Sequence, residues 1–96
     1  MASGTIQVGI PIFNKQISGT TATTGGIGSP ISTTDYIVIA AVPTGNTSYY
    51  SLTIGSYNGN WNFSAVANNA NLSALSNTTI TFDVYYIRRM DVVDVT

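Results

Sequence analysis

The chain has 96 residues without His, Cys or Glu, and three basic and four acidic residues give it a net charge of −1. Without imidazole or thiol groups it lacks the commonest catalytic groups and the ligands of zinc clusters, so we expect a non-enzymatic protein that holds no metal and no cofactor. Three basic residues are too few to follow a phosphate backbone, so we expect no nucleic-acid partner. No apolar run approaches the roughly 18 residues of a membrane span.

Small size and scarce charge favour self-association. A chain of this length forms one domain with a modest core, and without Cys no disulfide can stabilise it. Hydrophobic residues make up 44% of the chain and charged residues 7%, whereas soluble proteins average about 25% charged residues. We therefore expect a partner to cover much of the surface, and a homo-oligomer would provide that cover.

The N-terminal third begins with alternating segments and continues as a small, polar stretch. Residues 5–10 alternate in polarity, and residues 12–17 form a second short candidate strand. Residues 18–30 are rich in Gly, Ser and Thr, which favours a loop or an extended arm that lies against a neighbouring subunit. We interpret residues 1–30 as N-terminal strands with an assembly arm, and residues 31–96 as a β-sandwich core.

The remaining segments have the patterns of strands and turns. Residues 36–42 are a continuous apolar run, which is typical of a strand buried on both faces. Residues 49–54 alternate in polarity, and the Asn58-Gly59 pair that follows is the strongest short-range signal of a hairpin. Residues 68–77 read as a polar loop, and residues 90–95 as a possible short terminal strand.

The longest predicted strand covers residues 79–87, with every second side chain apolar. No helical periodicity of useful length occurs. The sequence therefore predicts an all-β protein, a small antiparallel β-sandwich of jelly-roll or immunoglobulin-like type with about six to eight strands. Its expected core consists of Ile37, Ile39, Leu52, Ile54, Trp61, Phe63, Ile80, Phe82 and Val84.

The order of segments from Lys15 to Arg89 resembles a module at the C-terminal tips of bacteriophage tail-fibre, head-fibre and appendage proteins. In that module a Thr/Gly-rich stretch precedes a buried apolar strand, here residues 18–28 and 36–42. A hairpin with a glycine and a tryptophan follows, here residues 57–63, and the module ends in an aromatic strand led by Asn-Thr, here residues 77–87.

The resemblance implies a β-sandwich knob, typically a homotrimer, that is carried on a virion and used for host attachment or assembly. A capsid decoration protein that stabilises the head surface is an alternative, and a carbohydrate-binding module is another. The first residues lack the basic segment and apolar core of a signal peptide, so we expect synthesis in the host cytoplasm and localisation in the virion.

Six residues are candidates for contact with another virion protein or a host cell-surface glycan. Tyrosine offers a large and rigid contact area, and Asn-rich loops offer amides that suit a neutral glycan. A subunit interface or an ordinary surface turn would use the same residue types. The candidates are Tyr49, Tyr57, Asn58, Asn69, Asn71 and Tyr85.

Two further candidate sites have structural alternatives. Trp61 and Phe63 could form a platform for sugar stacking, but a tryptophan on a strand of a small sandwich is more often part of the core. Asp35 and Asp83 could meet across strands as the carboxylate pair of a glycosidase, although nothing in the sequence indicates a cleft around them. Arg88 and Arg89 are expected to pair with Asp91, Asp94 or a neighbouring chain.

Overall fold

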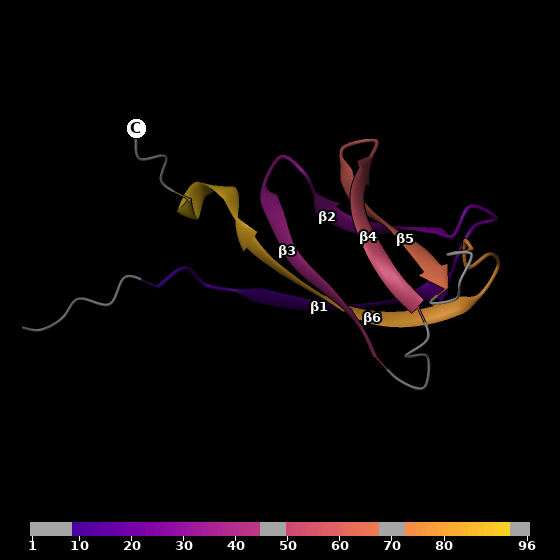
Figure 1. Cartoon of the computed structure of the whole chain (residues 1–96). Coiled ribbons are helices and arrows are strands. Elements are labelled where there is room, and N and C mark those ends of the chain that lie inside the picture. The colour runs from indigo at the N-terminus through magenta and orange to yellow at the C-terminus, as the bar shows by residue number, and fades with distance from the viewer. Residues whose placement is uncertain (1–8, 45–49, 68–72, 93–96) are drawn as a thin grey trace, which may run out of the picture.

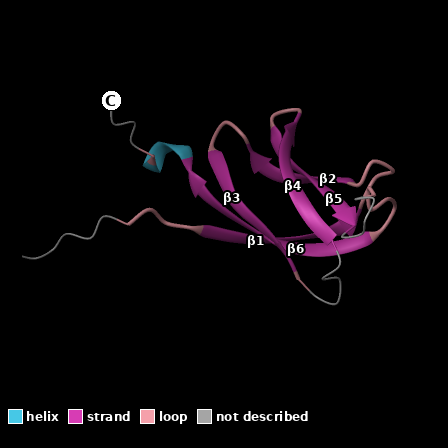
Figure 2. Ribbon diagram, in the orientation of Figure 1, coloured by secondary structure: helices cyan, strands magenta, loops and turns pink. Residues whose placement is uncertain are grey.

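The computed structural model describes residues 9–44, 50–67 and 73–92. These residues form two antiparallel three-stranded sheets packed face to face (Figures 1 and 2), so the prediction of an all-β antiparallel sandwich is confirmed. Sheet A has the order β1-β6-β3, and sheet B has the order β2-β5-β4. The strands are β1 (Phe13–Thr20), β2 (Gly26–Ser32), β3 (Tyr36–Pro43), β4 (Tyr50–Tyr57), β5 (Asn60–Ala67) and β6 (Thr79–Arg88).

The central strands β5 and β6 carry most of the core. Alternation in β6 turns Ile80, Phe82 and Val84 inward, and all three are at most 1% exposed. In β5 the fully buried Phe63 meets Phe82 edge-to-face, with 5.1 Å between the ring centroids. This contact joins the middle strand of one sheet to the middle strand of the other.

The prediction that Ile37, Ile39 and Ile54 belong to the core is wrong. Ile37 and Ile39 flank the buried Val38 and face away from the core, and Ile39 is 48% exposed. Ile54 is 38% exposed because it lies on the edge strand β4. The expectation that residues 36–42 are buried on both faces is wrong because the two sheets cover only the inner face of each strand, and Val42 on the outer face is also exposed. Leu52 and Trp61 are partly buried against the core.

The predicted loop over residues 18–30 is also wrong. β1 continues to Thr20, β2 begins at Gly26, and only residues 21–25 connect the two. β1 pairs with β6 and β2 pairs with β5, so this segment belongs to both sheets, and Ile31 of β2 is 3% exposed in the core. Glycine content suggested flexibility, but Gly26 and Gly28 are ladder residues opposite Ser64 and Asn62.

The short connection from β1 to β2 explains one glycine and one threonine. Gly25 has φ of 84°, and a Cβ there would lie 2.6 Å from the carbonyl oxygen of Ala65, so the position requires glycine. Thr21 is 2% exposed, and its hydroxyl oxygen donates to the Leu75 carbonyl and accepts from the Thr78 amide. Thr21 therefore ties this connection to the segment before β6.

Both ends of the chain differ from the predicted strands. Residues 9–12 have no regular structure, and residues 5–8 of the predicted first strand lie outside the described residues. After β6 the chain forms a short 3₁₀ helix, η1 (Arg89–Asp91), so the described part of the predicted strand over residues 90–95 is not a strand, and residues 93–95 lie outside the described residues. Leu75 of the predicted polar loop packs against the core, and Leu72 lies outside the described residues.

Candidate functional site

Two turns and η1 meet at one end of the sandwich, which we call the hairpin end (residues 33–35, 57–60 and 88–92). The carbonyl oxygen of Gly59 accepts hydrogen bonds from the Thr33 amide and the Thr33 hydroxyl, at 2.9 and 3.1 Å. These bonds tie the β2–β3 turn to the β4–β5 turn. Asn58 and Gly59 both have positive φ, at 51° and 81°, which the twist of a two-residue hairpin requires. The predicted hairpin is therefore confirmed.

Arg89 attaches η1 to the same turn. Its backbone amide donates to the Asp35 carbonyl oxygen at 2.9 Å, and its side-chain Nε donates to the Thr33 carbonyl oxygen at 2.7 Å. We expected Arg89 to pair with Asp91, Asp94 or a neighbouring chain, and this carbonyl was not foreseen because only the fold brings the turn next to the end of β6. The Ser32-Thr33-Thr34-Asp35 stretch is itself a recognisable turn signal.

Arg88 is occupied by partners of its own chain. Its Nε lies 2.8 Å from a carboxylate oxygen of Asp91, so the predicted pairing with Asp91 is confirmed. The hydrogen bond to Asp91 and the carboxylate charge raise the pKa of the Arg88 guanidinium, so it stays charged at any ordinary pH. The guanidinium also lies 5.8 Å from the ring centroid of Phe13, within range of a cation–π contact.

Aromatic rings from all three strands of sheet A lie beside Arg88. Tyr86 of β6 stacks on Phe13 of β1 with 5.7 Å between centroids, and it meets the edge of Tyr36 of β3 at 5.2 Å. Tyr36 in turn accepts a hydrogen bond at its carbonyl oxygen from the Trp61 indole of β5, at 3.0 Å. The hairpin end is thus held together by a chain of contacts that crosses from sheet A to sheet B.

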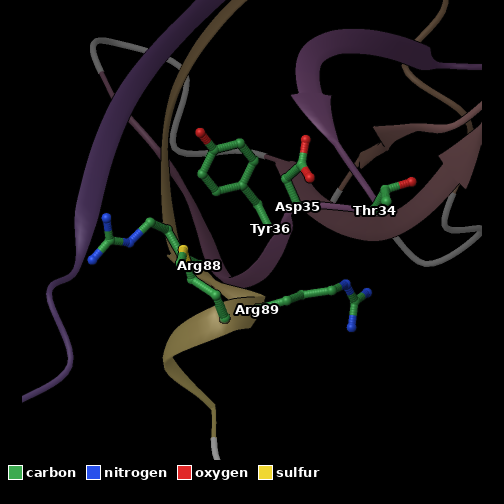
Figure 3. A pocket seen from close by; sticks show the side chains of 6 residues that line it. Thr34, Asp35, Tyr36, Arg88 and Arg89 are labelled. Atoms are coloured by element: carbon green, nitrogen blue, oxygen red, sulfur yellow. The ribbon is translucent and has the colours of Figure 1, made fainter.

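A half-open hollow of about 340 Å³ lies at this end, and Figure 3 shows the side chains that line it. The guanidinium groups of Arg88 and Arg89 point to opposite sides of the hollow, and neither faces the Asp35 carboxylate (Figure 3). No two of the labelled polar groups converge on one point, which a nucleophile with its base or an oxyanion site would need. The residues that line the hollow are Thr34, Asp35, Tyr36, Arg88, Arg89 and Met90.

The two carboxylates considered for glycoside hydrolysis are far apart along the sheet. Asp35 lies in the turn before β3, next to the pair formed by Tyr36 and Arg88, whereas Asp83 pairs with Val42 near the other end of β3. Within the described parts of the chain, no group of three or more carboxylates is placed to hold a metal ion. Asp94 lies outside the described residues.

The candidate contact residues do not form one cluster. Tyr57 is 70% exposed at the hairpin end, beside the exposed Asn58. Tyr85 is half-buried in the middle of β6, between Asn14 and Ala40 of the neighbouring strands. Tyr49, Asn69 and Asn71 lie outside the described residues. Tyr57 and Asn58 are therefore the pair of candidates that the structure places side by side.

Trp61 and Phe63 do not form a sugar platform. Phe63 is completely buried, and Trp61 packs partly buried against the core with its indole N–H donated to the Tyr36 carbonyl. A stacked sugar would need an open aromatic face. The interpretation of both residues as core residues is the one that fits.

Comparisons of the chain with protein-family models, with curated proteins and with solved structures found no match. No helix in the described ranges is long and apolar enough to cross a membrane.

Trp61→Phe should destabilise the sandwich. The change keeps an aromatic ring but removes the donor to the Tyr36 carbonyl oxygen, so we expect the free energy of unfolding to fall by about 1–2 kcal/mol. Urea unfolding followed by circular dichroism measures it, since the variant lacks the only tryptophan. Tyr57→Phe, which removes an exposed hydroxyl, is the control and should stay within about 0.5 kcal/mol of wild type. Equal losses in the two variants would contradict the role of the indole N–H.

Proposed function

We propose that the chain is a non-enzymatic structural module of a bacteriophage virion, a homotrimeric knob of a fibre or appendage. The observation that carries the proposal is the distribution of charge. Strands β2, β3, β4 and β5 contain no charged residue, and the charged side chains of the described residues lie on β1, on β6 and at the hairpin end. A surface this neutral suits contact with other protein copies better than catalysis or the binding of a charged substrate.

Two of the four segments on which the resemblance to phage tip modules rests have definite places in this fold. The glycine and tryptophan of that pattern lie in the β4–β5 hairpin, where Gly59 provides the turn and Trp61 joins the sheets. The Asn-Thr-led aromatic strand is β6, the central strand of sheet A. These two segments are the part of the resemblance that supports the proposal.

The proposed oligomer has a direct test. The chain has a mass of 10.1 kDa, so light scattering behind size exclusion should give three times that mass over a wide range of concentrations. A net charge of −1 produces little repulsion between copies of the chain, so trimerisation can cover the neutral surface. A stable monomer at every concentration would contradict the trimeric knob. It would favour a decoration subunit that meets its partner only on a capsid.

Host attachment through the hairpin end is the second candidate function, because Tyr57 and Asn58 are exposed together there. If the knob attaches to a glycan, Tyr57→Ala should weaken its binding on a glycan array about tenfold, which corresponds to about 1.4 kcal/mol. Asn58→Gly removes the amide but keeps the positive φ that the turn requires, and should weaken binding as well.

Asn14→Ala, an exposed position on β1, is the matched control for the glycan experiment and should bind as wild type does. Binding that survives both hairpin-end variants would contradict attachment at this end. A wild-type protein that binds no glycan but binds isolated phage heads would favour the decoration function.

A further inference from the structure

Each sheet of the sandwich has two edge strands, which are β1 and β3 in sheet A and β2 and β4 in sheet B. An edge strand presents unpaired amides and carbonyls that can pair with a strand of another chain. Proteins protect such edges with inward-pointing charges, prolines or bulges. The four edges of this protein differ in this protection.

Three of the edges are protected. On β1 the exposed Lys15 lies opposite the buried Val84, so a charge occupies the inward-facing side of that edge. β2 contains Pro30, and its register to β5 shifts between Gly28 and Ser32. β3 has a register shift between Val38 and Ala40 and ends at a proline. Each device disturbs pairing with a further strand.

β4 has none of these devices. It pairs with β5 in one unbroken register from Tyr50 to Tyr57, and it contains no proline and no charged residue. Among the described residues, no strand pairs with the other edge of Leu52–Ser56. We call Leu52–Ser56 the open edge. It is regular, uncharged and ready to accept one more strand.

The side of the sandwich at the open edge is apolar. β3 lies next to β4 there (Figure 1), and Ile54 of β4 is 38% exposed although it faces inward. Inward-facing positions on β4 are apolar, as Leu52 and Ile54 show, while Thr53 and Gly55 face outward. An added strand would fit if its apolar side chains also alternated, with small uncharged residues between them.

The N-terminal segment of the chain has that pattern. Ile6, Val8 and Ile10 alternate with Thr5, Gln7 and Gly9, and no charge occurs among them. The described residues 9–12 precede β1, run away from both sheets (Figure 1) and leave Ile10 and Ile12 45% and 61% exposed. Within the described part of the chain, both isoleucines therefore remain partly exposed to solvent.

The chain's own N-terminal segment begins on the wrong side to reach the open edge. β1 is the edge of sheet A that lies away from β3, whereas β4 lies on the side of β3. We propose that residues 5–10 of a neighbouring copy add to the open edge as a fourth strand of sheet B. This contact joins different surfaces of two copies, so it can close a ring, and it rests on the homotrimer proposed above.

Two variants test the proposed strand addition by light scattering. Deletion of residues 1–11 removes the donor and leaves β1 whole, and Ile54→Lys places on β4 the same inward charge that protects β1. Both should reduce the wild-type trimer to a monomer while the circular dichroism spectrum is kept. Gln16→Lys adds the same charge at an exposed position of β1 and should remain a trimer.

Amide hydrogen exchange supplies a second measurement that does not depend on the trimer. A synthetic peptide of residues 1–12 added to the deletion variant should slow exchange at the open edge, and should not do so in the Ile54→Lys variant of the deleted chain. A trimer that survives the deletion would overturn the proposed strand addition and leave the proposal of a trimeric knob intact. Association of the deletion variant that is lost only when Ile54→Lys is added would also overturn the strand addition, because that result means that β4 pairs with a strand other than residues 5–10. A monomeric wild type would overturn the trimer. The effect of the peptide on amide hydrogen exchange would then be the test of the strand addition.

Discussion

The packing of Phe63 against Phe82 is the interaction on which the sandwich depends. Both rings are fully buried, and they lie on the middle strands of the two sheets, so each is flanked by two further strands. Two hydrogen bonds between the sheets reinforce this contact, from the Trp61 indole to the Tyr36 carbonyl and from the Tyr50 hydroxyl to the Thr81 carbonyl. The core is small, but each of the other four strands pairs with one of the two central strands, β5 and β6.

This arrangement determines which parts of the surface are available for function. With β5 and β6 in the centre, the remaining strands are all edges, and their exposed isoleucines become surface features. Both arginines have partners within the chain, Arg88 with Asp91 and Arg89 with the Thr33 carbonyl. The neutral surface, the open edge and the tied hairpin end are the features on which our proposal of a structural module rests.

The sequence predicted those elements whose pattern is local. The β4–β5 hairpin follows from Asn58-Gly59, because that turn needs two residues with positive φ. The inward face of β6 follows from the alternation of Ile80, Phe82 and Val84. Such patterns depend on neighbours along the chain and not on the position of a strand within its sheet.

What the sequence could not predict depends on tertiary pairing. An apolar run such as Tyr36–Pro43 does not show which of its side chains face the second sheet, so the exposure of Ile39 could not be predicted. Gly26–Ser32 reads as a loop by composition and becomes a strand because β5 offers it a ladder. At the hairpin end, the bond from Arg89 to the Thr33 carbonyl joins residues far apart in sequence, and no motif announces it.

The most direct test of this account is the free energy of unfolding of Phe63→Ala, measured by urea denaturation beside Met90→Ala. Met90 is 80% exposed, so its truncation should change stability by no more than about 0.5 kcal/mol. Phe63→Ala leaves a cavity between the two central strands and should cost about 3–5 kcal/mol, enough to unfold much of a small domain. A loss no larger than that of Met90→Ala would contradict the central role of this contact.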